Sequence, residues 1–508
     1  MKLTVDNQLV TLGELRRAWL EAVHVDVGPD ARRAIAESQE FISEVVAHGD
    51  TVYGVNTGFG QLASVRISDD ELAHLQENLV RSHAVGVGED LDDDIVRLIM
   101  LMKVIALAEG FSGVRIELIE ALSALINNEI YPRIPSRGSV GASGDLAPLA
   151  HMAGALIGIG EVRVKGNLVP AAIALKEAGI EPVRLAPKEG LALLNGTQVS
   201  TALALAAVFR TENLLSAALM AGAMSSDAIK GSDTPFDRRI QNVRGHGGQN
   251  AVAGVLRNLM RGSEIRASHE DCDRVQDPYS IRCQPQVMGA CLDVLRHVCS
   301  VLETEANAVT DNPLVFADSS VVLSGGNFHA EPVALAADYL ALAIAEIGAL
   351  SERRIALLID AHLSGLPGFL VAEGGLNSGF MMAQVTAAAL ASENKSHAHP
   401  ASVDSLPTSA NQEDHVSMAT FAARRLHTMI DNVADIVAIE LLAATQGIQF
   451  RRFKSSPPIE DVIAAIREIS PKYEEDRSLA SDIRRVAATV DNGDFCRYAE
   501  SVLPSMTE

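Results

Sequence analysis

A glycine- and serine-rich segment, GSVGASGDLAPLAH at residues 138–151, contains residue types and spacings that suggest chemistry. It matches neither common phosphate-binding loop, because Lys is absent and the glycine spacing differs. It also lacks the Gly-x-Ser-x-Gly elbow of serine hydrolases, since Gly144 directly follows Ser143. As an ordinary loop before an apolar helix, the segment would use Asp145 as the N-cap and would attract anions to its N–H groups.

Three small residues in this segment, Ala142, Ser143 and Gly144, could instead form a ring from their own main chain. If the Gly144 nitrogen attacks the Ala142 carbonyl carbon, a five-membered ring closes, and glycine has no Cβ to obstruct this approach. Ser143 could then lose its hydroxyl as water, which would leave an exocyclic alkene and so an electrophile made from backbone. Residue types alone leave both interpretations open, because plain glycine-rich turns are far more common.

Six further motifs accompany this tripeptide: YGVNTGFG at 53–60, LNG at 194–196, QDPYSIR at 276–282, TDNP at 310–313, GNFH at 326–329 and NQEDH at 411–415. Together they resemble, in the same order, the motifs of the aromatic amino-acid ammonia-lyases. Members of that family carry a methylidene-imidazolone (MIO) electrophile that forms autocatalytically from Ala-Ser-Gly. The resemblance therefore implies a MIO group from Ala142, Ser143 and Gly144, with no external cofactor and no metal.

Two polar positions favour an imidazole-containing substrate. His83 follows Ser82 where phenylalanine lyases typically carry an apolar pair, and Glu413 offers a carboxylate where those lyases lack one. An imidazole has two ring nitrogens, and leaving them unpaired in a pocket is costly. Because His83 also occurs in some tyrosine-specific relatives, Glu413 carries more of this inference. The structural alternatives are a satisfied helix-terminal histidine for His83 and a helix N-terminal charge for Glu413.

The resemblance implies that the protein converts L-histidine to trans-urocanate and ammonia, the first step of histidine degradation. The nearest alternative is a tyrosine ammonia-lyase or a MIO aminomutase, and the alternative outside enzymes is a catalytically inactive helical scaffold. The family likeness also implies a homotetramer whose active sites are shared between subunits.

The resemblance assigns catalytic roles to three further residues. Tyr53 would remove the substrate β-proton, although a phenol with an ordinary pKa of about 10 must be lowered or transiently ionised to do so. Asn195 and Tyr279 would belong to the polar shell around the MIO group, where developing charge needs hydrogen-bond donors. Without the motifs, a satisfied buried tyrosine or an ordinary loop hydrogen bond would explain these residues.

Three other residues are implied to bind the substrate. Arg282 would anchor the substrate carboxylate, since a guanidinium fork matches it in bidentate geometry. Gln276 would position the amine or the MIO oxygen, and Phe328 would form an aromatic wall. A surface ion pair, a loop hydrogen bond and a core phenylalanine are the respective alternatives. His397 and His399 only weakly indicate a metal site, because no nearby Cys or helix-borne third ligand completes it.

Composition restricts the class of protein. The 508 residues carry 42 Lys and Arg against 65 Asp and Glu, a net charge of −23, which excludes most nucleic-acid binders because they need a basic face. Five cysteines without a C-x-x-C pair do not fit a disulfide framework or a structural zinc site. No signal-peptide core precedes residue 20, and the most apolar stretches, such as 201–209 and 340–345, fall short of a membrane span. We therefore expect a cytoplasmic protein without a membrane or nucleic-acid partner.

The elements that position these residues are expected to be mainly α-helical, with a core of Ala, Leu, Val and Ile. Helices are predicted at residues 71–84, 95–108, 199–228, 285–308, 332–365, 379–396 and 415–445. Small hairpins are predicted at residues 3–10 and 162–168, around Asp6-Asn7 and Lys165-Gly166-Asn167.

The pattern predicts an elongated helix bundle, which the resemblance places in the aspartase/fumarase-like lyase type, with a smaller mixed N-terminal region. Residues 1–198 would carry the tyrosine loop and the MIO loop, and residues 199–508 would form the bundle and the C-terminal helices. Both would belong to one continuous lyase unit.

Overall fold

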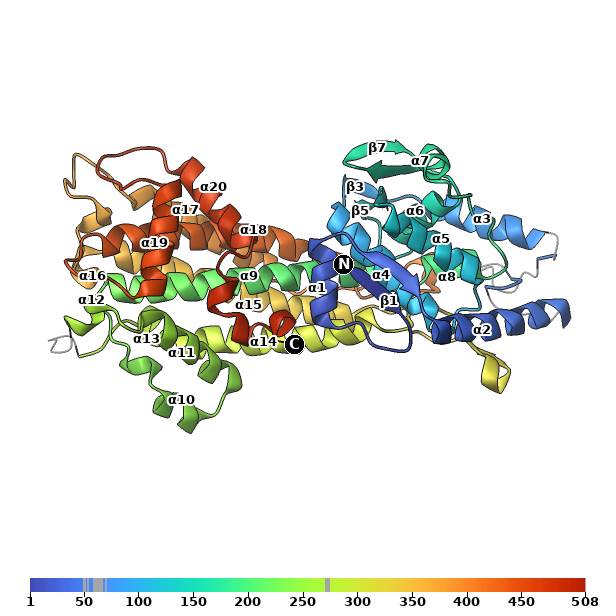
Figure 1. The fold of residues 1–508 in the computed structure, drawn as a ribbon, viewed down its shortest axis with the longest axis horizontal. Helices are drawn as coiled ribbons and strands as arrows, with labels where there is room; N and C mark the ends of the chain where they lie inside the picture. Colours follow the sequence, from blue (N-terminus) through green and yellow to red (C-terminus); the bar gives the residue numbers. More distant parts are fainter. Residues whose placement is uncertain (49–51, 53, 58–66, 69–70, 270–274, 508) are drawn as a thin grey trace. The chain divides into compact units, whose positions relative to one another are not determined.

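The computed structural model describes residues 1–508 except 49–51, 53, 58–66, 69–70, 270–274 and 508. The described chain is mainly helical with nine short strands, which confirms the predicted fold class (Figure 1). Unit 1 comprises Met1–Ala206, Cys299–Asp338 and Pro400–Arg424, and unit 2 comprises Ala207–Val298, Tyr339–His399 and Arg425–Glu508. Each unit combines segments far apart in the sequence, whereas the division expected at residue 198 follows chain order and stays a prediction.

Unit 1 contains all of the described strands. Its complete helices are α1 (Leu12–Leu20), α2 (Pro29–His48), α3 (Leu72–His83), α4 (Asp93–Ala108), α5 (Ile116–Asn127), α6 (Leu146–Leu156), α7 (Ala171–Ala178) and α8 (Glu189–Leu194). Its strands are β1 (Lys2–Val5), β2 (His24–Val27), β3 (Val87–Asp90), β4 (Ile130–Pro132), β5 (Pro135–Arg137), β6 (Glu161–Val164), β7 (Asn167–Pro170), β8 (Leu314–Phe316) and β9 (Val321–Leu323). β1 pairs in parallel with β2, whereas β3–β5, β4–β6–β7 and β8–β9 are antiparallel.

Helix α4 forms much of the unit 1 core and packs against α1, α2 and α5. Asp93 and Asp94 occupy its first turn, where carboxylates favour the helix N-terminus. Every residue from Ile95 to Ala108 is buried, including the charged side chain of Lys103. A cation in so apolar a helix needs polar partners inside the protein.

One predicted hairpin is confirmed and the other is wrong. β6 and β7 form the expected antiparallel pair, and Lys165 and Gly166 at the turn both have positive φ, as a tight hairpin turn requires. At the N-terminus, β1 pairs with β2 across α1 rather than turning back at Asp6. The Asp6 carboxylate instead accepts from the Ala31 N–H at 2.8 Å, at the start of α2.

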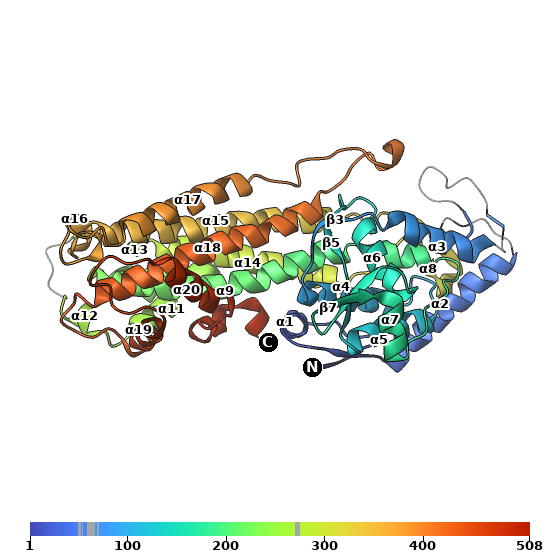
Figure 2. The same cartoon turned by 90° about the horizontal axis from the view of Figure 1, so that it is seen from above.

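Four long helices contribute residues to both units: α9 (Gln198–Ala228), α14 (Gln284–Ala306), α15 (Glu331–Ile359) and α18 (Ala419–Ile448). The remaining helices of unit 2 are α10 (Arg238–Arg244), α11 (Gly247–Met260), α12 (Glu264–Ala267), α13 (Tyr279–Arg282), α16 (Ala361–Ser364), α17 (Met381–His397), α19 (Pro457–Ile469) and α20 (Ala480–Asp491). Within unit 2, α17 lies beside α15 and α18 (Figure 2).

Two predicted helices have different ends. α15 ends at Ile359 rather than near residue 365, because the Asp360 carboxylate accepts from the His362 N–H at 2.8 Å and starts the separate helix α16. α18 begins at Ala419, after Met418 adopts a positive φ of 57°. The four residues before it thus belong to a loop.

By length and hydropathy alone, α9 and α15 qualify as candidate membrane spans, which corrects the expectation that every apolar stretch is too short. The most apolar windows of these helices are 94% and 67% buried, respectively, as core helices also are. Burial inside the protein therefore accounts for their apolar composition.

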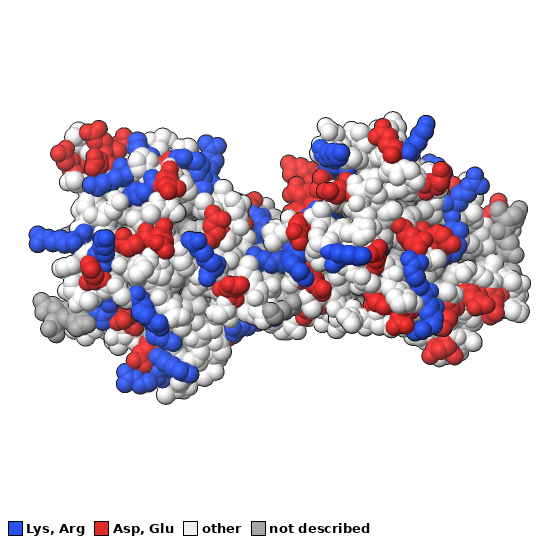
Figure 3. Space-filling view, viewed as in Figure 1, with Lys and Arg blue, Asp and Glu red and all other residues white. Residues whose placement is uncertain are grey.

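Charges of both signs lie on the face drawn in Figure 3, and a buried ion pair lies inside unit 2. On the face drawn in Figure 3, Lys and Arg side chains are interspersed with Asp and Glu. In unit 2, Arg354 of α15 pairs with Glu440 of α18 at 2.5 Å, and both side chains are 0% exposed. Ser225 of α9 and Ser351 of α15 also donate to this carboxylate. The carboxylate therefore links three helices.

Candidate active site

A cavity of about 960 Å³ in unit 1 is lined by six of the residues expected at an active site. They are His83, Ala142, Ser143, Asn195, Phe328 and Glu413. These residues come from the end of α3, the loop before α6, the residue after α8, the segment before α15 and the loop before α18. Motifs that are far apart in the sequence therefore meet in one cavity.

The main chain at Gly144 accepts only glycine. Its φ is +77°, and a Cβ built there would lie closer than 3.0 Å to the nitrogen, carbon and oxygen of Gly196. The two glycines form an isolated parallel bridge, and the Asp145 N–H donates to the Gly196 carbonyl at 2.8 Å. The loop and the LNG motif therefore hold each other in place through backbone atoms.

Asp145 anchors this loop in a way that differs from the expected N-cap. It precedes α6, but its side chain makes no capping hydrogen bond there. The carboxylate is fully buried and accepts instead from the Ser200 N–H at 2.8 Å, near the start of α9, and from the Ser200 hydroxyl. The hydroxyls of Ser139 and Thr420 also donate to it, each at 2.7 Å. One buried carboxylate thus joins three separate segments behind the cavity.

Asn195 reaches the tripeptide directly. Its Nδ2 donates to the Ser143 carbonyl oxygen at 3.1 Å, and its Oδ1 is buried without a hydrogen-bond partner among the described residues. Lys103 Nζ donates to the Asn195 main-chain carbonyl at 2.6 Å and to the Ala192 carbonyl at 3.2 Å. Lys103 therefore fixes the backbone that carries Asn195.

Lys103 was not identified from the motifs, although a lone Lys within the apolar run at 95–108 was a readable signal. Burial lowers the pKa of its ammonium to about 7, and the nearby Asp311 carboxylate acts in the opposite direction. Asp311, in the TDNP motif, pairs with the equally buried Lys188 at 2.6 Å. A buried polar network thus underlies the cavity.

Glu413 contacts the tripeptide from the loop before α18. The Ser143 hydroxyl donates to Glu413 Oε1 at 2.5 Å, and the Thr408 hydroxyl donates to Oε2 at 2.6 Å. α18 begins only at Ala419, so Glu413 is not in the first turn of that helix. The helix N-terminal alternative for Glu413 is therefore wrong.

His83 is the last residue of α3 and also lines the cavity. Its Nδ1 lies 2.8 Å from the Leu79 carbonyl oxygen, which can only accept, so Nδ1 carries the proton of that bond. In the neutral ring, Nε2 then has a lone pair available. His83 is thus both a helix-terminal histidine with a hydrogen-bond partner and a residue of the cavity wall.

Phe328 is half-buried at the cavity wall, so it is not a core phenylalanine. Tyr53 lies outside the described residues. Its neighbour Gly54 is described, and a Cβ on Gly54 would lie closer than 3.0 Å to Leu191 Cδ2. Leu191 lines the cavity, so Gly54 lies close to the cavity wall.

Gln276, Tyr279 and Arg282 belong to unit 2, whereas the cavity described above is built from unit 1. Gln276 and Arg282 line a second cavity of about 490 Å³. The Arg282 guanidinium lies 4.6 Å from the ring centroid of the exposed Tyr279, and Arg282 Nε is buried without a hydrogen-bond partner among the described residues. A guanidinium with an unused donor is suited to bind a carboxylate.

Comparison with known proteins decides the family. The family model for aromatic amino acid lyases matches residues 10–468. The chain belongs to this family. It is 60% identical over 490 residues to a protein named histidine ammonia-lyase from Aromatoleum aromaticum, which covers 96% of this chain and 93% of the relative. A protein of the same name from Vibrio cholerae is 59% identical over 481 residues, 94% of each chain.

Solved structures of aromatic amino acid lyases and related aminomutases have the same fold. The crystal structure of histidine ammonia-lyase from Trypanosoma cruzi matches with a TM-score of 0.91 and 41% identity, over 99% of this chain and 96% of the other. The tyrosine aminomutase from Streptomyces globisporus matches with a TM-score of 0.93 and 37% identity, over 98% of each chain. The predicted family resemblance and lyase fold are therefore confirmed.

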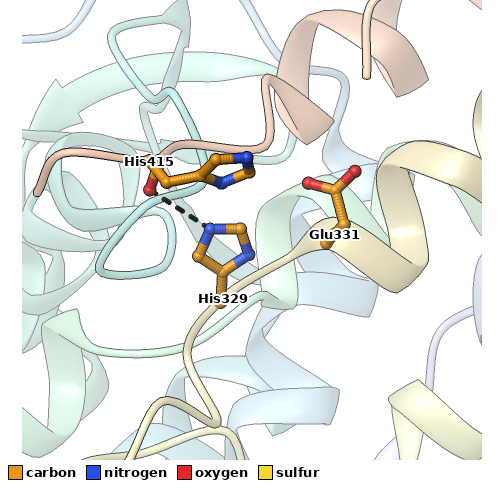
Figure 4. A group of neighbouring side chains, drawn as sticks. All are labelled: His329, Glu331 and His415. Carbon is orange, nitrogen blue, oxygen red and sulfur yellow. Dashed lines mark hydrogen bonds between the residues drawn. The ribbon is translucent and has the colours of Figure 1, made fainter. Parts of the chain in front are cut away.

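One cluster of possible metal ligands in this lyase was not found from the motifs. His329, Glu331 and His415 each offer a ligand atom, and these atoms all lie within 4.8 Å of one another (Figure 4). The histidines considered from the sequence lie elsewhere, and His397 Nε2 is 3.4 Å from a Glu393 carboxylate oxygen. His329 and Glu331 are close in the sequence, whereas His415 approaches them only in the folded chain.

Proposed function

We propose that this protein is a histidine ammonia-lyase that converts L-histidine to trans-urocanate and ammonia, the first step of histidine degradation. The observation that carries the proposal is the single cavity that contains Ser143, Asn195, His83 and Glu413. The names of the relatives from Aromatoleum aromaticum and Vibrio cholerae support the same activity.

We propose that Ala142, Ser143 and Gly144 mature into a MIO group without an external cofactor. Such a group supplies an electrophilic alkene that captures the substrate amine and turns it into a better leaving group. The residues present fit it, because Ala142 is small and buried, and the backbone at Gly144 packs too closely on Gly196 for a side chain. Loss of the Ser143 hydroxyl would also remove a donor from Glu413 Oε1 and free that oxygen for the substrate.

Asn195 would stabilise charge at the Ser143 carbonyl oxygen, to which its Nδ2 already donates at 3.1 Å. Its buried Oδ1 has no partner among the described residues and would accept from the substrate ammonium. Lys103 would keep this amide in position through the Asn195 carbonyl.

His83 and Glu413 would bind the imidazole ring of the substrate. The Glu413 carboxylate can accept from one ring N–H, and His83 Nε2 offers a second acceptor because Nδ1–H donates to Leu79. Phe328 would pack on the ring. Replacing Glu413 by Gln should lower kcat/KM for L-histidine roughly 10- to 100-fold, since a hydrogen bond to a charged group is worth about 1.5–3 kcal/mol.

Tyr53 would be the base that removes the β-proton, and three residues of unit 2 would complete the site. Arg282 would bind the substrate carboxylate through its unused Nε and the rest of its guanidinium, with Tyr279 and Gln276 beside it. We also propose a homotetramer in which each active site draws residues from more than one subunit, a proposal that rests on the family to which the chain belongs.

Complementation tests this assembly. Ser143→Ala and Arg282→Met should each abolish activity, and co-expression of the two variants should restore part of it, because some mixed sites then contain both native residues. If every site were built from one chain, the mixed protein would stay inactive. Sedimentation that shows fully active monomers would also contradict shared sites.

The substrate and the MIO group are tested together by assay and intact mass. Wild-type protein should release ammonia and urocanate from L-histidine and should be lighter than its sequence by two water molecules, and Ser143→Ala should lose both properties. Ammonia released only from L-tyrosine would instead support a tyrosine ammonia-lyase. Formation of β-tyrosine from L-tyrosine would support an aminomutase. Inactive protein with full sequence mass would support a helical scaffold.

We further propose a cytoplasmic enzyme that has no nucleic-acid or membrane partner. The net charge of −23 opposes binding to polyanions. Cys283 and Cys291 are free thiols in the structure, as in a reducing compartment. Fractionation of cells that express the full chain tests this location.

A further inference from the structure

The proposed reaction does not use His329, Glu331 or His415, although the two histidines line the unit 1 cavity. Figure 4 shows their three side chains converging from the start of α15 and from the loop before α18. We propose that these residues form a three-ligand site for a divalent transition-metal ion, best matched by Zn²⁺. Its open coordination position would face the cavity.

The geometry is close to that of a chelating site. The ligand atoms lie within 4.8 Å of one another, and the two imidazole rings are 5.6 Å apart at their centroids. Zinc binds nitrogen and oxygen ligands at about 2.0–2.2 Å, so modest side-chain rotations bring all three onto one ion. His329 Nε2 lies 3.3 Å from the His415 carbonyl oxygen. If that nitrogen donates, Nδ1 keeps the lone pair, and Figure 4 shows it on the side of Glu331.

Glu331 provides an independent indication of a missing ligand. Its Oε2 is buried and has no hydrogen-bond partner among the described residues. A buried carboxylate oxygen without a partner is costly, and an ion is one way to satisfy it. Its position in the first turn of α15 explains a negative charge at a helix N-terminus, but not the convergence of two histidines on it.

Backbone hydrogen bonds hold both ligand segments against the same loop. The Ala330 N–H, between the first two ligands, donates to the Gly141 carbonyl at 3.2 Å. The Met418 N–H, three residues after the third ligand, donates to the Val140 carbonyl at 2.9 Å. The ligand set is therefore preorganised by the fold, which reduces the entropy that metal binding must overcome.

The donor types select the class of ion. Two imidazole nitrogens and one carboxylate suit Zn²⁺ and neighbouring divalent transition metals, whereas Mg²⁺ and Ca²⁺ prefer oxygen ligands alone. Three protein ligands also leave a coordination position for water or another small ligand.

Direct metal binding tests the proposal. Full-length protein, stripped with a chelator and dialysed, would be titrated with ZnCl₂ by calorimetry, and its zinc content measured by atomic absorption. We expect one zinc per chain in the wild type, and affinity lowered at least roughly tenfold in Glu331→Gln and His415→Ala, since even outer-shell partners can change affinity by that amount. His397→Ala is the matched control, because this unit 2 histidine contacts a carboxylate but belongs to no three-ligand group among the described residues.

Circular dichroism would verify that each variant is folded, and Glu331→Gln preserves side-chain size. Absence of stoichiometric zinc in the wild type would overturn the proposal, as would equal affinity in all variants. Zinc is measured without L-histidine, so this outcome is separate from that of the proposed ammonia-lyase activity.

Discussion

The tight contact between Gly144 and Gly196 predicts that a single methyl group will stop maturation of the active site. In Gly144→Ala, alanine must adopt a φ near +77°, a left-handed conformation that costs roughly 1–2 kcal/mol. Its Cβ would also lie closer than 3.0 Å to three backbone atoms of Gly196, and no rotamer change can relieve that overlap. The loop must therefore move away from the LNG motif.

A matched variant separates the two effects. Gly166, in the β6–β7 turn, has nearly the same φ of +78°, but nothing lies within 4 Å of a Cβ built there. Gly166→Ala should thus pay the conformational cost alone, lose roughly 1–2 kcal/mol of stability and keep full activity.

Intact mass and ammonia release measure the outcome. Ring closure needs aligned reacting atoms, and a displacement of about 1 Å can cost 100-fold in rate. We therefore expect Gly144→Ala to keep its full sequence mass and to lose at least about 100-fold in activity, while Gly166→Ala shows the two-water loss that we propose for the wild type. If Gly144→Ala lost two waters as fast as Gly166→Ala, the steric argument would be refuted.

Two buried cations give further predictions. Burial lowers the pKa of Lys103 to about 7 from its ordinary value of 10.5. Between these two pH values the unfolded chain binds a proton that the folded chain lacks, so the stability contributed by this group rises with pH. The free energy of unfolding of Lys103→Met, measured with urea, should rise less with pH than that of the wild type, by up to about 1.4 kcal/mol per pH unit, and parallel profiles would contradict the assignment. Arg354→Met should destabilise the protein by about 3–5 kcal/mol because Glu440 is left buried without its partner. Adding Glu440→Leu should recover part of that loss in urea unfolding, and a double variant no more stable than Arg354→Met would argue against an unpaired charge as the cause.

Local sequence was sufficient for elements whose causes lie within a few residues. Apolar periodicity predicted α4 and most of α9, and Lys165-Gly166 predicted the β6–β7 turn. The motifs also named Ala142, Ser143, Asn195, Phe328 and Glu413 among the residues that line the cavity, because each motif keeps its own order of residue types. Tyr53 alone among the predicted residues lies outside the described chain.

Strand pairing and hydrogen bonds between distant segments could not be predicted from local sequence. Both hairpin predictions used the same alternating pattern, but β1 found its partner beyond α1, since an alternating strand fits a parallel neighbour equally well. Asp145 looked like a cap for the next helix, yet its acceptors are used by donors at Ser139, Ser200 and Thr420.

The amino-acid sequence by itself determined most of the long helices and one tight turn, because dihedral preferences and short-range periodicity are properties of neighbouring residues. Only the tertiary structure placed Glu413 against Ser143, Lys103 beneath Asn195, and His415 beside Glu331. Hydrogen bonding and the desolvation of charge depend on which distant groups come within about 3 Å, and that is set by the packing of the whole chain.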